Sequence, residues 1–200
     1  MTTPTPVERL KDALAALEAE FDTELAASRA RLRYRVERGR VIFDREVSAR
    51  HRAARVKLRE FLAAARPAVV LTAPVIYSLI LPFAILDLFV SLYQTICFPV
   101  YGIEKVRRSD HIAIDRQNLA YLNGLQKLNC VYCGYCNGLI SFVREVAGRT
   151  EQYWCPIKHA RRLAGSHDHY GDFIDFGDAE RFCEKSRPLR DRLRPRAPDG

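Results

Sequence analysis

Five residues that could bind a metal or react as nucleophiles are concentrated in the stretch Lys127–Ala160. Within these 34 residues the chain places four of its six cysteines and one of its five histidines. The first three cysteines have the spacing C-x2-C-x2-C. The fourth cysteine and the histidine are separated by three residues and form a C-x3-H pair. Thiolates and imidazoles at such spacings are typical ligands of soft metals. They are Cys130, Cys133, Cys136, Cys155 and His159.

Three chemistries fit this block. The first is a tetrahedral Cys3His zinc site, in which the metal staples a module too small to hold itself together. Its ligands would be Cys130, Cys133, Cys155 and His159. The second is a [4Fe-4S] cluster in which Cys136 replaces His159, because three close cysteines with a distant Cys-Pro look like half of a bacterial ferredoxin motif. The third is thiol-disulfide exchange at Cys130 and Cys133, although a thioredoxin-like βαβ context is absent. The alternative is that the cysteines bind no metal and undergo no reaction, and are reduced side chains packed in a core.

The elements that would position these ligands are predicted to be short helices joined by turns. Leucines at helical spacing predict a helix over 115–128, with Cys130 and Cys133 in the turn after it. A second helix is expected to start near Asn137, whose amide can cap it, and to bury Leu139, Ile140, Val143 and Val146. A short helix beginning at Pro156 would bring His159 close to Cys155.

One resemblance bears on the choice of metal. The runs KLNCVYCGYCNGL and REVAGRTEQYWCPIKHA resemble a block of bacterial membrane-associated proteins of unknown activity, and they cover about a fifth of the chain. In those proteins the position that matches Cys136 is often small or apolar, which implies a site made without it. The resemblance therefore favours zinc over the iron-sulfur cluster.

A second group of polar residues follows the block. His167 and His169 form an H-x-H pair in the acidic stretch SHDHYGDFIDFGDAE, where they could bind a metal, act as an acid and base, or lie in a solvated loop. Asp178 is placed to cap a last helix that carries Cys183. No phosphate-binding loop, nucleophile elbow or catalytic triad is recognisable, so nothing in the sequence supports an enzyme.

A long apolar segment precedes the cysteine block. Between Pro67 and Ile103 the only charged residue is Asp87, and the run exceeds the roughly 20 residues that a helix needs to cross the hydrocarbon core. Basic residues flank both ends, and the positive-inside rule therefore draws both flanks to the cytoplasm. With Pro74 and Pro82 near the middle, the segment is predicted to form a membrane-inserted helical hairpin in which Asp87 lies near the interface or is bonded within the hairpin.

The region before the apolar segment is expected to form one or two long helices over Val7–Ala65. Apolar residues from Val7 to Leu32 recur at intervals of three, four and seven, as in a coiled coil. This seam predicts either packing on the same chain or a stalk for a homodimer or a protein partner, with a bend at Gly39. Basic residues further on predict contact with anionic headgroups rather than nucleic acid, because no nucleic-acid reading motif accompanies them. They are Arg50, Arg52, Arg55, Lys57 and Arg59.

Together these features predict an all-α protein of the bacterial inner membrane with its soluble module in the cytoplasm. The regions are a basic helical region 1–66, a membrane-inserted segment 67–103, a cysteine-rich helical module 104–193 and a disordered tail 194–200. The net charge of +8 suits contact with an anionic membrane. The predicted function is a membrane-anchored, zinc-stapled adaptor or accessory protein. The alternative is an iron-sulfur carrier that delivers electrons at the membrane surface.

Overall fold

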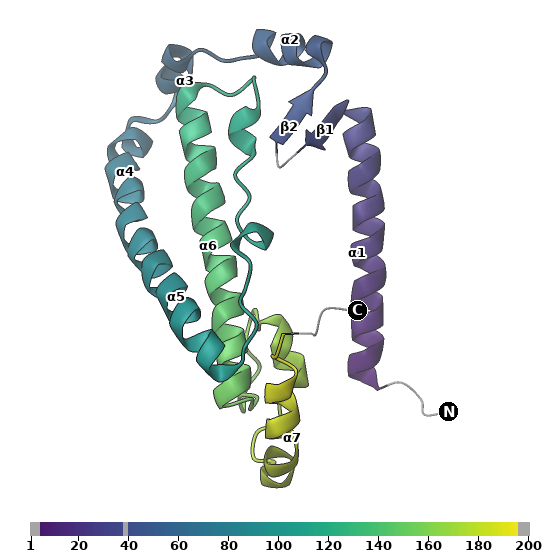
Figure 1. Ribbon diagram of the computed structural model, residues 1–200. Coiled ribbons are helices and arrows are strands. Elements are labelled where there is room, and N and C mark those ends of the chain that lie inside the picture. The colour runs from purple at the N-terminus through teal and green to yellow at the C-terminus, as the bar shows by residue number, and fades with distance from the viewer. Residues whose placement is uncertain (1–4, 38–39, 196–200) are drawn as a thin grey trace. The chain divides into compact units, whose positions relative to one another are not determined.

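The computed structural model describes residues 5–37 and 40–195 and is mostly helical (Figure 1). Gly39, where a bend was predicted, and residues 196–200 of the predicted tail lie outside this range. The helical class is confirmed, apart from one two-stranded hairpin. The elements are α1 Pro6–Arg31, β1 Tyr34–Glu37, β2 Arg40–Phe43, α2 Arg45–Ala53, α3 Leu58–Ala64, α4 Pro67–Ser78, α5 Ile80–Tyr101, α6 Gly124–Trp154 and α7 Ala179–Asp191, with the 3-10 turns η1 Arg108–Asp110, η2 Arg116–Asn118 and η3 Asp168–Asp172.

The chain divides into two compact units. The first joins the residues before Arg66 to residues 115–131, and the second joins residues 66–114 to the residues from Tyr132 onward. The predicted membrane segment and most of the predicted cysteine module therefore belong to the same unit.

The first unit begins with a well-capped helix. The Thr5 hydroxyl accepts a hydrogen bond from the Glu8 amide, and the Glu8 carboxylate accepts one from the Thr5 amide, which together form a capping box at the start of α1. The prediction of long helices throughout Val7–Ala65 is wrong after Arg31, because β1 and β2 pair there, with Val36 opposite Val41. Valine, isoleucine and aromatic residues favour strands, and they overrode the helical pattern.

In the second unit, α4 and α5 continue in one direction (Figure 1). They form one bent helix of 35 residues from Pro67 to Tyr101, the one helix of the described residues that is long and apolar enough to cross a membrane. The predicted hairpin is not formed. Pro82 lies in the first turn of α5, where a missing N–H breaks no helical bond, and α4 continues past Pro74 to Ser78.

The core of the second unit lies between α5 and the part of α6 from Tyr132 onward. These helices run side by side in the same direction, with Tyr93 hydrogen-bonded to Thr150 at 3.0 Å. Gly138 lets the loop of residues 102–114 approach α6, because a Cβ at this position would lie 2.8 Å from the backbone oxygen of His111. The buried apolar residues of this core are Phe98, Ile103, Val106, Leu139, Phe142, Val146 and Leu193.

The last helix, α7, is fixed to the end of α6 by side chains that reach backbone carbonyls. Gln152 donates from Nε2 to the carbonyl of Leu189 at 2.7 Å, and Arg190 donates from Nε to the carbonyl of Tyr153 at 2.6 Å. Asp178 accepts from the amide of Arg181 and caps α7, as predicted.

Candidate functional site

The first three cysteines lie inside a continuous helix rather than in a turn. Cys130, Cys133 and Cys136 are all part of α6, so the predicted break between two helices is wrong. No proline interrupts residues 124–155, and Leu139 and Val146 continue the buried face of one helix. Asn137 does not cap a helix. Its amide instead donates to the carbonyl of Cys133, one turn earlier, at 2.9 Å.

This helix separates the residues that were expected to bind one zinc ion. Cys155 follows the last residue of α6, and a rise of 1.5 Å per residue places it about 33 Å along the helix from Cys133. The expected short helix at Pro156 is absent, because residues 156–158 pair with Ile174 in an extended bridge. His159 stacks on Tyr170. Within residues 5–37 and 40–195 no group of three or more His, Cys, Asp or Glu side chains could hold a metal ion.

The cysteines differ in their surroundings. Cys136 is buried, and its burial raises the pKa of its thiol, which favours the neutral form that packs in a core. Cys133 and Cys155 are exposed, whereas Cys130 is half-buried. Cys183 is exposed on α7, and Cys97 is half-buried on α5. All six thiols are free in the structure.

The structure assembles a different set of polar residues at the C-terminal half of α6, here called the imidazole-carboxylate cluster. His169 donates from Nε2 to Glu145 at 3.0 Å, and His167 donates from Nε2 to Glu151 at 3.0 Å. Arg149, one turn after Glu145, donates from Nε to the same carboxylate at 2.7 Å. The cluster consists of Glu145, Arg149, Glu151, His167 and His169.

The electrostatics of the cluster centre on Glu145. The hydrogen bond from His169 and the one from Arg149 lower the pKa of this carboxyl from 4.5 to about 2, although burial opposes the shift. Its side chain is 17% exposed, so water screens these bonds only in part. Glu145 is therefore an ionised anchor at neutral pH rather than a proton donor.

A glycine makes the approach of the two histidines possible. A Cβ on Gly148 would lie 3.0 Å from the ring of His167 and 3.3 Å from that of His169. The buried Nδ1 atom of His167 has no hydrogen-bond partner among the described residues. The H-x-H segment therefore packs on α6 as a clasp, and the expectation of a solvated loop for this segment is wrong.

Sequence reasoning missed Glu145 and Glu151 as partners of the two histidines. The sequence does contain a signal: Gly148 lies between the acidic residues Glu145 and Glu151 on one predicted helix, and the H-x-H pair follows about 20 residues later. The cluster holds the residues after Trp154 against α6, and its two carboxylates are occupied by nitrogen donors. Its chemistry is that of a structural anchor.

The predicted membrane-surface residues lie in the first unit and are solvent-exposed. Arg50 and Arg52 are in α2, Arg55 and Lys57 are in the link that follows, and Arg59 is in α3. The predicted long basic helix is thus replaced by two short helices and a connection. Arg50 lies 3.8 Å from the Glu46 carboxylate, and all five side chains are exposed to solvent, where they can meet a charged surface.

The lone charge of the apolar segment is neutralised within the second unit. Arg108 binds both carboxylate oxygens of Asp87, and one of these contacts is 2.9 Å long. Tyr135 of α6 donates to the same carboxylate at 2.9 Å, and Ser91 donates to it at 3.1 Å. A paired carboxylate costs far less in an apolar environment than a bare one, so Asp87 does not exclude contact with lipid.

No protein-family model, curated protein or solved structure matches the chain, and the resemblance of its cysteine block to bacterial membrane-associated proteins stays a prediction.

Proposed function

We propose that this protein is a membrane-anchored adaptor or accessory protein at the cytoplasmic face of the bacterial inner membrane. The observation that carries the proposal is the helix from Pro67 to Tyr101, whose most apolar stretch has no residue buried in the protein. An apolar surface of this length in water marks a binding site for lipid or for another apolar partner. The exposed basic residues of α2 and α3 support an anionic membrane surface as the neighbour.

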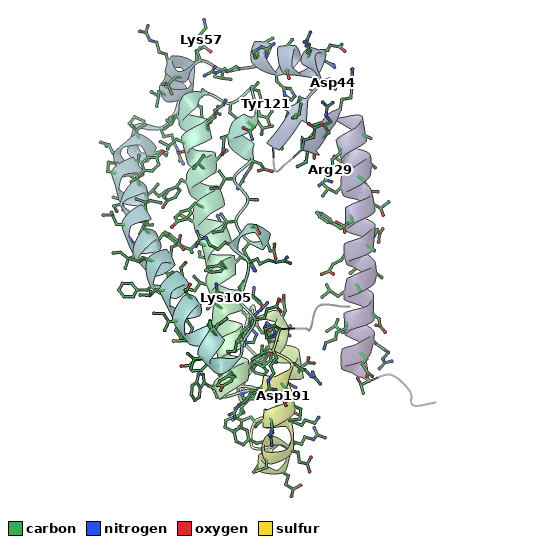
Figure 2. All side chains as sticks on the ribbon, viewed as in Figure 1. Arg29, Asp44, Lys57, Lys105, Tyr121 and Asp191 are labelled. Carbon is green, nitrogen blue, oxygen red and sulfur yellow. The ribbon has the colours of Figure 1, made fainter. Side chains whose placement is uncertain are left out.

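The adaptor part of the proposal rests on α1. Side chains project from α1 along its length (Figure 2), and the apolar ones of its seam are exposed. The spacing of four, three and four residues is that of a coiled-coil seam, which needs a second helix to bury it. We assign this seam to a partner helix, either from a second copy or from another protein. Its residues, each more than half exposed, are Leu10, Leu14, Leu17 and Phe21.

Site-specific photo-crosslinking in native membranes tests both parts. A photoreactive phenylalanine analogue replaces Leu17 in the full chain. The matched control replaces Ala19, which lies on the opposite side of α1, since two residues turn a helix by about 200°. We expect the protein to stay in the membrane pellet after a high-salt wash and to form an adduct from position 17 alone.

The mass of the adduct identifies the partner as a second copy or another protein. Equal adducts from both positions, or none from position 17, would contradict the docking role of α1. Recovery of the unmodified chain in the soluble fraction would contradict the membrane anchor.

Zinc remains a prediction of the sequence. Since no third ligand lies near Cys133 among the described residues, a zinc ion at this helix would need ligands from a partner or from a second copy. The same holds for an iron-sulfur cluster, which needs four ligands. The adaptor function proposed here does not depend on either metal.

A further inference from the structure

Helix α5 has a face that is covered by protein. Gln94 is buried and binds the backbone of Val106 twice, accepting from its N–H at 2.7 Å and donating to its carbonyl at 3.3 Å. One turn later, Phe98 is completely buried among the residues of the core between α5 and α6. This face of α5 therefore cannot meet lipid.

The opposite face of α5 is a bare apolar stripe. Its residues recur at intervals of three and four over four turns, which places them on one side of a helix. Each is more than half exposed. The stripe consists of Ile85, Leu88, Phe89, Leu92, Ile96 and Val100. In α4, by contrast, no residue is buried, although Tyr132 of α6 donates to the Ile76 carbonyl at 2.7 Å and packs its ring against Tyr77.

The protein that covers α5 could not lie in the hydrocarbon core. Residues 102–114 are irregular apart from η1, and they carry charged side chains, of which Arg107 is 82% exposed. Irregular backbone and exposed charges are not tolerated in contact with lipid chains. If α5 stood across the bilayer, this segment would lie at the depth of the acyl chains. The covered face of α5 must therefore point to water while the bare stripe points to lipid.

The path of the chain leads to the same conclusion. The residues before Arg66 and residues 115–131 pack into one compact unit, and a single compact unit lies on one side of a bilayer. The chain leaves this unit at α4 and returns to it after Ile114. The return segment of residues 102–114 contains charged residues such as Arg107 and Asp110 and is not a membrane-spanning helix.

We infer that α4 and α5 form a monotopic anchor, in which the bare stripe of α5 lies in the acyl region of one leaflet and α4 enters the same leaflet without crossing the bilayer. The inference rests on the proposed membrane attachment and specifies its geometry. The occupant of the stripe is lipid, because the apolar surface continues without a charge from α4 onto the bare side of α5. Lys105 and the exposed Arg107 lie next to the end of α5, within reach of anionic headgroups.

Depth measurement by fluorescence quenching tests the inference. Single tryptophans are placed at Ile85, Leu92 or Val100 in full-length Trp154→Phe protein, and Lys105→Trp is the matched control on the water side. The proteins are reconstituted in phosphatidylethanolamine and phosphatidylglycerol vesicles whose acyl chains are brominated at shallow or deep carbons. Ile85 and Val100 are separated by about 22 Å along the helix.

We expect the three stripe positions to lose fluorescence to the same extent with shallow bromines, and the control, which lies at the level of the headgroups, to lose clearly less. A depth that changes from position 85 to position 100, with the deepest quenching between them, would show a crossing helix and overturn the inference. Protein that stays in the supernatant would instead overturn the membrane attachment itself.

A second measurement does not depend on the tryptophan variants. The native chain carries a protease-sensitive tag at both ends in sealed, oriented vesicles. Loss of both tags to protease added from one side is the expected result, whereas protection of one tag alone would show an odd number of crossings and overturn the monotopic anchor.

Discussion

Glu145 is expected to control how firmly the segment after α6 is held. Its pKa is lowered from 4.5 to about 2 because His169 and Arg149 donate to the carboxylate. A shift of this size corresponds to about 3 kcal/mol of stabilisation at neutral pH. Since the folded pKa is below the unfolded one, this stabilisation is complete above pH 4.5 and is lost as the pH falls from 4.5 toward 2. Glu145→Gln removes the charge at every pH while it keeps the shape of the side chain.

Amide hydrogen exchange measures the effect where it should occur. The amide of Lys158 donates to the Ile174 carbonyl, and that of Ile174 donates to the Pro156 carbonyl, so both amides are protected while the clasp is closed. If the full 3 kcal/mol acts on the local opening, Glu145→Gln should speed their exchange by about a hundredfold at neutral pH.

The matched control is Glu184→Gln, which removes an exposed carboxylate on α7 and should leave both rates unchanged. The difference between Glu145→Gln and the native protein should narrow as the pH is lowered below 4.5. Unchanged exchange at Lys158 and Ile174 in the variant would refute the role given to the cluster.

Two further predictions concern α6. Gly138→Ala should lower the thermal stability of the second unit, because the new Cβ would lie 2.8 Å from backbone atoms of residues 111 and 112, whereas Gly124→Ala meets nothing within 4 Å and should be neutral or slightly stabilising. Metal analysis of anaerobically purified protein should find about one zinc per chain if the zinc prediction is correct, with loss of zinc in Cys133→Ser and retention in Cys136→Ala. Brown protein that loses its colour in Cys136→Ala would favour a cluster. A metal-free protein would contradict both metal predictions and would leave Cys136 as a packing residue and Cys133 as an exposed thiol.

The sequence alone identified features that depend on neighbouring residues. The apolar run from Pro67 onward, the cap at Asp178 and the apolar seam of α1 follow from composition and from helical spacing, and the structure contains each of them as a helix or a helix end. Of the four residues predicted to form the buried face near Cys136, Leu139 and Val146 are buried, but Ile140 is half exposed. The predicted helical period of the apolar residues is correct, but the face of α6 that packs against α5 is rotated away from Ile140.

Only the tertiary structure decided which distant residues meet. Extending an existing helix by further residues costs little free energy, because the costly step is the formation of the first turn. Packing of α6 against α5 therefore decides that the helix continues through Cys130 and Cys133. That continuity separates Cys133 from Cys155. The pairing of His167 was likewise decided by the tertiary structure, because the carboxylate that accepts its hydrogen bond, that of Glu151, stands 16 residues away on another element. Spacing along the chain predicts contacts within one helix. Contacts between elements depend on how the connecting segments fold back, and residue spacing does not encode that path.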